Sequence, residues 1–287
     1  MVYDVAIIGG GPAGISAGIY CMRAGKSTII FEGKELGGKL NEIDKIENYP
    51  GFVGSGKELA KNFEAHIQKF ACEIKKKFVQ NVIKLGAKFM ISAGTDIYEA
   101  KKVIYCGGFK QNTYDFAKKY EGNGVSYCAT CDGMFYRGKT VVLVGSGADA
   151  QEEAMFLGGL CKKVYVVSDK PIDISGENFE KFTPYKLVGI DGENIVSGVT
   201  LQRIDDKTTT HLDVDGVFLA IGGRAKNVLT DIKSEDFIKT DGGATEVKGL
   251  FVAGDIDDGN IKQVVVACAS GANAAIKAIK ELNSDNL

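Results

Sequence analysis

The stretch YDVAIIGGGPAG, residues 3–14, decides the fold because it joins a short apolar run to a glycine-rich turn. Residues 3–8 predict a buried parallel strand, and a helical pattern through Ile15, Ile19 and Met22 follows the turn. Residues 27–31 predict a second strand, and Glu32 ends it. Strand, spaced glycines, helix, second strand and terminal acid together form the βαβ fingerprint of a dinucleotide site.

Each part of this fingerprint has a physical role at a pyrophosphate. Gly9, Gly11 and Gly14 allow a tight turn and a close approach of the backbone to the phosphates. The N-terminus of the following helix stabilises their negative charge, and Glu32 is predicted to bind a ribose hydroxyl. We therefore favour a bound dinucleotide over a glycine-rich turn without a ligand.

A second, less complete fingerprint begins at Thr140. Residues 141–144 and 164–167 predict strands, with GSGADA (145–150) at the start of the helix between them. After the second strand, an NADP site would need an arginine for the 2′-phosphate, but the chain has Asp169, which would repel it. An acid at this place suits the free ribose hydroxyl of NADH, so the pattern alone leaves NADH open.

The spacing of these units predicts the domain organisation. The chain has 287 residues, which suits one large or two medium domains. FVAGD (251–255) predicts a further strand, and a helix is expected from about Gln263 to Leu282. We expect an α/β protein with two Rossmann-like, three-layer domains. The first comprises residues 1–109 and 243–287, and a smaller domain, residues 110–242, is inserted into it.

Composition narrows the class of protein further. A formal charge of −2 argues against a general nucleic-acid binder, which would carry a basic face. No apolar run approaches the roughly 20 residues needed to cross a bilayer, and the first residues lack the features of a signal peptide. Seven cysteines scattered through a long chain do not form the pattern of a secreted disulfide framework. The expected location is the cytoplasm, with no membrane partner.

Cys128 and Cys131 form a CxxC, a spacing that lets two thiols close a small disulfide ring. At a helix start the first thiol gains thiolate character, and Asp132 could donate or accept a proton. A zinc site needs about four ligands, whereas the chain has no second CxxC and only two histidines. A redox pair is therefore favoured, with no metal. The single cysteines are interpreted as small core residues: Cys21, Cys72, Cys106, Cys161 and Cys268.

Five motifs between residue 2 and about residue 280 resemble those of the low-molecular-weight thioredoxin reductases. They are GGGPAG, ENYPGF (47–52), YCATCDG (127–133), FVAGD and KQVVVACASGANAA (262–275). CATCDG between two dinucleotide units is highly specific. The resemblance implies a homodimer of two-domain subunits whose FAD domain is split by an inserted domain carrying the CxxC.

The resemblance also implies roles for individual residues. Cys128 would attack the disulfide of thioredoxin, Cys131 would face the flavin, and Asp132 would serve as general acid or base. Lys39 stands where the family has glutamine, and the segment around Gly107 reads YCG in place of ATG. The residues expected to contact FAD are Gly9, Gly11, Pro12, Ala13, Gly14, Glu32, Gly38, Lys39, Leu40, Asn48, Val79, Gly107, Gly254, Asp255, Gln263 and Val264. Among them, Asn48, Gln263 and Val264 would lie near the isoalloxazine, Val79 near the adenine, and Asp255 at the ribityl chain.

The departures from the family concern the electron donor. The family's second fingerprint is GGGxSA followed by an HRR cluster that grips NADPH, whereas this chain has GSGADA and SDK (168–170). Residues 171–183 are also shorter than the family's segment, and Gly223 replaces a histidine. This profile is similar to that of the ferredoxin-dependent flavin thioredoxin reductases. A flavin can accept single electrons from ferredoxin and pass them on as a pair, as reduction of a disulfide requires.

Two other functions stay open. One is an NADH- or NADPH-dependent disulfide reductase, most readily NADH-linked through Asp169. The other is a flavin-bound electron-transfer or scaffold protein whose CxxC no longer turns over. Ferredoxins are acidic, so a docking patch should be basic; the candidates are Lys75–Lys77, Lys101, Lys102, Lys118, Lys119, Lys162 and Lys163.

Overall fold

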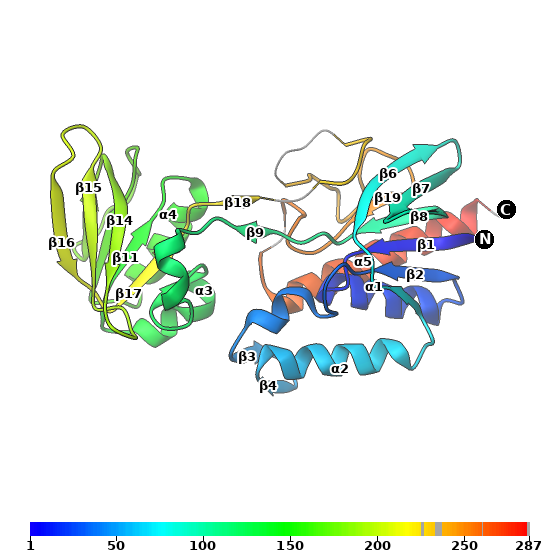
Figure 1. The fold of residues 1–287 in the computed structure, drawn as a ribbon, viewed down its shortest axis with the longest axis horizontal. Coiled ribbons are helices and arrows are strands. Elements are labelled where there is room, and N and C mark those ends of the chain that lie inside the picture. The colour runs from blue at the N-terminus through cyan, green and yellow to red at the C-terminus, as the bar shows by residue number, and fades with distance from the viewer. Residues whose placement is uncertain (225–226, 233–236, 260, 286–287) are drawn as a thin grey trace. The chain divides into compact units, whose positions relative to one another are not determined.

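The computed structural model describes residues 1–224, 227–232, 237–259 and 261–285. The chain folds into two compact units (Figure 1), one formed by residues 1–110 and 224–287 and the other by residues 111–223. Each unit is built on a mainly parallel or wholly parallel sheet. The predicted α/β class with two Rossmann-like units is confirmed.

Within the described residues, the sheet of the first unit has seven strands in the order β5-β2-β1-β8-β7-β6, with β19 paired to β8. The strands β5, β2, β1, β8 and β19 run parallel, and β7 runs antiparallel to both of its neighbours. Their bounds are β1 (Val2–Ile8), β2 (Thr28–Phe31), β5 (Glu73–Lys75), β6 (Val79–Leu85), β7 (Lys88–Ala93), β8 (Asp96–Tyr105) and β19 (Leu250–Val252). The predicted first strand and the strand after Lys26 are therefore present.

The side chains of the central strand β1 alternate between the two faces of this sheet, and each face has a hydrophobic core. Val5 and Ile7 are buried on one face with the helices α1, α2 and α5, while Ala6 and Ile8 are buried on the other. The helices are α1 (Pro12–Arg23), α2 (Gly56–Gln68) and α5 (Val264–Ser284). The short elements η1 (Gly38–Glu42), β3 (Ile46–Tyr49) and β4 (Phe52–Gly54) complete the first half of this unit.

Two contacts hold α1 against α5: a close backbone approach that only glycine permits, and a hydrogen bond. A Cβ at Gly271 would lie 2.1 Å from the carbonyl oxygen of Ala13, so glycine is what lets the two helices approach. The Ser16 hydroxyl donates a hydrogen bond of 2.7 Å to the carbonyl oxygen of Cys268. The predicted C-terminal helix thus packs on the helix of the first fingerprint.

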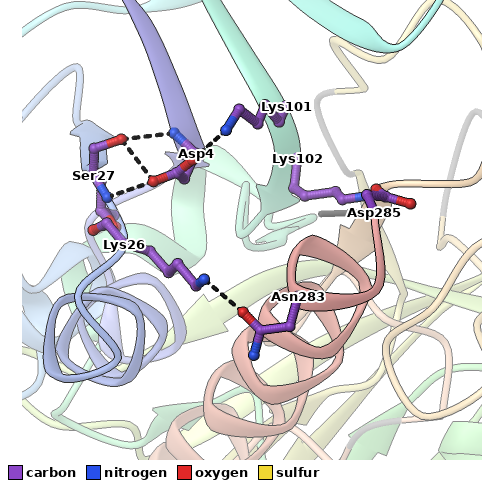
Figure 2. A network of polar contacts seen from close by, with 8 residues as sticks. Asp4, Lys26, Ser27, Lys101, Lys102, Asn283 and Asp285 are labelled. Carbon is purple, nitrogen blue, oxygen red and sulfur yellow. Dashed lines mark hydrogen bonds and ion pairs between the residues drawn. The ribbon is translucent and has the colours of Figure 1, made fainter. Parts of the chain in front are cut away.

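The C-terminal end of α5 is tied to the sheet by a polar network, which Figure 2 shows. The buried Lys102 ammonium on β8 lies 2.9 Å from Glu281 and 2.7 Å from Asp285. The neighbouring Lys101 lies 2.8 Å from Asp4 at the start of β1. A buried ammonium requires paired acids, so the two contacts of Lys102 fix the end of the helix, while the Lys101–Asp4 pair joins β8 to β1.

Within the described residues, the second unit has a five-stranded parallel sheet in the order β10-β17-β11-β12-β13 and a three-stranded antiparallel sheet, β14-β15-β16. The parallel strands are β10 (Val125–Ser126), β11 (Thr140–Val144), β12 (Lys163–Val167), β13 (Phe179–Phe182) and β17 (Gly216–Leu219). The antiparallel strands are β14 (Tyr185–Asp191), β15 (Gly198–Arg203) and β16 (Thr209–Asp213). The helical elements are η2 (Asp115–Tyr120), α3 (Ala129–Asp132), η3 (Gly133–Tyr136) and α4 (Ala148–Gly158). The strands β9 (Lys110–Gln111) and β18 (Gly223–Arg224) stand where the chain passes from one unit to the other.

Two features differ from the sequence interpretation. The second unit ends at Gly223, not near residue 242, because Val228, Leu229 and Ile238 are buried in the core of the first unit. The strand expected over 251–255 ends at Val252, because Gly254 takes a φ of 83° and turns the chain. The assignment of FAD binding and redox chemistry to the two units remains a prediction.

Candidate functional site

The loop between β1 and α1 is closed by contacts that only glycine permits. A Cβ at Gly9, where φ is 107°, would lie 2.1 Å from the carbonyl oxygen of Cys106, and one at Gly14 would lie 1.8 Å from that of Gly9. A Cβ at Gly11 would meet nothing within 4 Å, so the turn is open at the start of α1. Pro12 occupies the first helical turn, where its missing N–H is harmless. This tight, open turn at a helix N-terminus fits a pyrophosphate.

Glu32 is held beside this loop at the end of β2. Its Oε2 accepts a hydrogen bond of 2.8 Å from the backbone N–H of Gly10, and its Oε1 accepts one of 2.8 Å from that of Lys34. A cavity of about 510 Å³ borders the same carboxylate. An acid in this position fits the ribose hydroxyls of an adenosine.

A second glycine-rich segment lies against the first loop. The backbone N–H of Gly37 donates a hydrogen bond of 2.8 Å to the carbonyl oxygen of Gly10. A Cβ at Gly38 would lie 3.4 Å from the Cα of Gly11. The Lys39 ammonium lies 3.5 Å from the Asp255 carboxylate. Three segments that are far apart in the sequence therefore meet at this loop.

Asn48 and Gln263, two of the residues predicted to lie near the isoalloxazine, are in direct contact. The Asn48 amide donates a hydrogen bond of 3.0 Å to Oε1 of Gln263, the residue just before α5. Val264 begins α5, and the backbone N–H of Gly254 donates 2.8 Å to the hydroxyl of Ser270 on the same helix. The positive end of the α5 dipole thus lies next to these groups.

Three of the predicted FAD residues have evident packing roles. Leu40 is buried in a small core with residues of α2, and Val79 is buried among the residues of the sheet. A Cβ at Gly107 would lie 2.3 Å from the Tyr105 hydroxyl, so glycine makes room for that ring. Contacts of all these residues with FAD remain predictions.

The CxxC of the second unit is closed as a disulfide between Cys128 and Cys131. Cys128 is the N-cap residue of α3, and its sulfur accepts a hydrogen bond of 3.2 Å from the backbone N–H of Cys131. The Thr130 hydroxyl lies 3.3 Å from the same sulfur. Both cysteines are partly exposed, which suits exchange with another disulfide.

Ser126, which the sequence interpretation did not single out, connects the acid to the first cysteine. Its buried hydroxyl donates a hydrogen bond of 2.7 Å to the Asp132 carboxylate. The same oxygen accepts one of 3.1 Å from the backbone N–H of Cys128. The sequence does show a hydroxyl residue two positions before the CxxC, but the tertiary fold decides where that hydroxyl points.

The loop between β11 and α4 is sterically like the first loop but carries negative charge. A Cβ at Gly145 would lie 2.3 Å from the carbonyl oxygen of Ala220, whereas one at Gly147 would meet nothing within 4 Å. Asp149 lies in the first turn of α4. A hydrogen bond from the Ser146 hydroxyl lowers the pKa of Asp169, which keeps that carboxylate charged at neutral pH.

The five remaining cysteines carry free thiols within packed surroundings. Cys21, Cys106 and Cys161 are buried, and Cys72 and Cys268 are half-buried. Burial raises the pKa of Cys21 to about 12 and that of Cys161 to about 11, so these thiols stay protonated.

No helix in the described part of the chain is long and apolar enough to span a bilayer.

Comparison with known proteins extends over nearly the whole chain. Residues 3–271 match the pyridine nucleotide-disulphide oxidoreductase family. A thioredoxin reductase from Helicobacter pylori is 37% identical over 310 aligned residues, covering 97% of this chain and 98% of the relative. The crystal structure of a thioredoxin reductase from Streptococcus pyogenes has a TM-score of 0.90 at 32% identity, covering 99% of both chains. A ferredoxin-flavin thioredoxin reductase from Clostridium acetobutylicum has a TM-score of 0.57 at 31% identity, covering 100% of this chain and 99% of the other.

Proposed function

This chain belongs to the pyridine nucleotide-disulphide oxidoreductase family, and we propose that within it the chain passes electrons from reduced ferredoxin to thioredoxin. It is a flavoprotein of the thioredoxin reductase type that binds FAD. The proposal concerns the electron donor, because relatives with and without ferredoxin in their names are similar to this chain.

The observation that carries the proposal is the charge on the second glycine loop. The pyrophosphate of a pyridine nucleotide would meet Asp149 at the N-terminus of α4, and the 2′-phosphate of NADPH would meet Asp169 after β12. Asp149 opposes the attraction that a helix N-terminus normally offers to an anion, and Asp169 repels the 2′-phosphate. Residues 168–178, between β12 and β13, contain no helix, in keeping with the shortened segment noted in the sequence.

The first unit fits FAD, with the turn at Gly9–Gly14 for the pyrophosphate and Glu32 for the ribose. When bound, FAD supplies a carrier that accepts electrons singly and releases them as a pair. Asn48 and Gln263 would orient its ring through their mutual hydrogen bond. The residues that act on thioredoxin belong to the second unit.

The dithiol form of the CxxC would act by disulfide exchange. The Cys128 thiolate attacks one sulfur of the thioredoxin disulfide, giving a mixed disulfide and one thioredoxin thiolate. The Cys131 thiolate then attacks Cys128, which re-forms the Cys128–Cys131 disulfide and releases thioredoxin as a dithiol. Asp132, held by Ser126, exchanges the protons that the sulfur atoms gain and lose.

An anaerobic absorbance experiment tests the donor. We expect NADPH and NADH to leave the oxidised flavin spectrum unchanged over minutes, while reduced ferredoxin bleaches it. Rapid bleaching by NADH would favour the NADH-linked alternative through Asp169, and rapid bleaching by NADPH would equally end the proposal. A flavin bleached by ferredoxin that never reduces thioredoxin would favour the electron-transfer alternative.

Substitution of the proposed nucleophile gives the second arm of this test. Cys128→Ser should abolish thioredoxin reduction while FAD stays bound, because the exchange step needs the thiolate. Cys161→Ser, at a buried thiol outside the dithiol, is the matched control and should retain activity. Unchanged turnover of Cys128→Ser would remove the nucleophile from the proposal.

The homodimer and the cytoplasmic location implied earlier remain part of the proposal. The dimer is carried over from the resemblance to the low-molecular-weight thioredoxin reductases. Light scattering coupled to size-exclusion chromatography should give twice the subunit mass of 30.7 kDa. A monomer at micromolar concentration would contradict this.

A further inference from the structure

Most lysines that the sequence offered for ferredoxin docking are already neutralised. Lys102 is buried between two acids, and five others form ion pairs on the surface. These pairs are Lys75 with Glu73, Lys77 with Asp96, Lys101 with Asp4, Lys118 with Asp115 and Lys163 with Glu180. An ammonium group that is paired with a carboxylate of the same chain contributes little to the electrostatic field that would attract an acidic partner.

A different pair of ammonium groups lies over one aromatic ring in the first unit. The Lys39 ammonium is 5.5 Å and the Lys262 ammonium 5.0 Å from the ring centroid of Phe109. Lys262 is also 4.6 Å from the centroid of Phe237, and the two rings stack with centroids 4.8 Å apart. We call Lys39, Phe109, Phe237 and Lys262 the lysine–phenylalanine cluster.

The charges around this cluster leave a positive excess at the surface. Lys262 has no ion pair among the described residues, and Lys39 is balanced in part by Asp255 at 3.5 Å. Lys110, next to Phe109 in the chain, is exposed. Of the acids that follow Asp255, Asp258 is exposed, while Asp257 is buried and accepts hydrogen bonds from Thr240. Among the described residues named here, three cations therefore stand against two surface carboxylates.

The cluster sits on the segments proposed to hold the flavin. Lys39 follows Gly38, which lies against the pyrophosphate loop at Gly11. Lys262 directly precedes Gln263, the hydrogen-bond partner of Asn48. A protein that delivers electrons must bring its redox centre close to the flavin, so a docking surface is needed next to these segments.

We propose that the lysine–phenylalanine cluster is the surface on which reduced ferredoxin docks. This inference rests on the proposed function and names the surface that serves it. The rings restrain the two ammonium groups, so less side-chain entropy is lost when an acidic partner binds. Ile261, which is 68% exposed beside Lys262, adds an apolar contact at the rim of the charged groups.

Charge reversal in the FAD-loaded enzyme tests this surface. Lys262→Glu is compared with Lys280→Glu, which makes the same change of net charge near the other end of α5, about 24 Å along the helix from its first residue. We expect Lys262→Glu to weaken ferredoxin binding about ten-fold at low salt and the difference to disappear near roughly 0.5 M salt. Lys280→Glu should bind ferredoxin as the unchanged protein does. Binding is measured by calorimetry with oxidised ferredoxin and by the concentration dependence of flavin bleaching.

Two further measurements separate docking from damage to the site. All variants should show the same flavin absorbance per protein, and dithionite-reduced enzyme should reduce one equivalent of thioredoxin at an unchanged rate. If Lys262→Glu retains less flavin, Lys262→Gln is used, with about three-fold weaker ferredoxin binding expected at low salt. Unchanged ferredoxin affinity of Lys262→Glu, with wild-type protein still reduced by ferredoxin, overturns the docking surface alone. Failure of ferredoxin to reduce the wild-type protein overturns the proposed function itself.

Discussion

The two glycine loops of this protein share a steric plan and differ in charge. In each loop the first glycine lies against a backbone carbonyl oxygen that follows a neighbouring strand. A Cβ added at Gly9 would lie 2.1 Å from this oxygen, and one added at Gly145 would lie 2.3 Å from its counterpart. In each, the next glycine of the fingerprint, Gly11 or Gly147, leaves the turn open. The backbone geometry of a dinucleotide loop is therefore present twice.

The polar groups around the two loops are what separate them. The first turn of α1 holds no acid, and Glu32 is fixed by the backbone N–H of Gly10. The first turn of α4 holds Asp149, and the hydroxyl of Ser146 in the loop is hydrogen-bonded to Asp169, which follows β12. The comparison teaches that a loop can persist because it packs a strand against a helix, even where its charges oppose a nucleotide.

Loss of the first loop is the largest effect we expect. Gly14→Ala places a Cβ 1.8 Å from the carbonyl oxygen of Gly9, so the loop must move or the helix must shift. FAD affinity should fall more than about 100-fold, and the free energy of unfolding should fall by about 3 kcal/mol. Flavin absorbance per protein and urea denaturation measure the two quantities.

Gly147→Ala, at an open glycine of the second loop, is the control for a glycine-to-alanine change without a clash. Its added Cβ meets nothing within 4 Å, so FAD should stay bound, and the loss of a glycine N-cap should cost about 1 kcal/mol at most. Full FAD occupancy in Gly14→Ala would contradict the close packing of the first loop.

The sequence predicted the parts of this comparison that are local. Strands, glycine spacing and terminal acids are all read within about 30 residues, and the structure contains the corresponding βαβ units. The unpredicted parts depend on residues far apart in the chain. Phe109, Phe237 and Lys262 meet only through the fold, and Val228, Leu229 and Ile238 pack in the first unit although they lie in the range predicted for the inserted domain.

Ser126 gives the second prediction, because it contacts the residues proposed to carry the chemistry of the second unit. In the proposed function that unit uses the edge strand β10 and α3 at the dithiol, where Ser126 bonds to Asp132 and Cys128. Ser126→Ala should lower the rate of thioredoxin reduction about ten-fold, the cost of a hydrogen bond to a charged group. FAD content should not change, and Ser126→Thr should recover part of the rate.

The conservative variant distinguishes this positioning role from a loss of structure. Without the Ser126 hydroxyl the Asp132 carboxylate loses a hydrogen-bond donor, whereas Ser126→Thr keeps one, so only the alanine variant should show the full loss of about ten-fold in rate. Ser197→Ala, at an exposed serine of the same unit, should leave the rate unchanged. An equally slow Ser126→Thr, together with a lower free energy of unfolding for Ser126→Ala, would indicate a structural role only.

The smallest expected effect comes from removing negative charge at the second loop, which tests whether charge alone prevents a nucleotide from binding there. Because the pKa of Asp169 is lowered, its carboxylate is ionised throughout the neutral range, and mild acidification does not relieve its repulsion of a phosphate. Asp149→Asn combined with Asp169→Asn should therefore strengthen NADPH binding by about five-fold, the scale of exposed charge interactions. Equilibrium dialysis of NADPH at low salt measures this, with Asp205→Asn in the turn between β15 and β16 and Asp213→Asn at the end of β16 as the control for net charge. Unchanged affinity in the loop variant would mean that the short β12–β13 connection excludes the nucleotide and that the two loops differ in surrounding structure more than in charge.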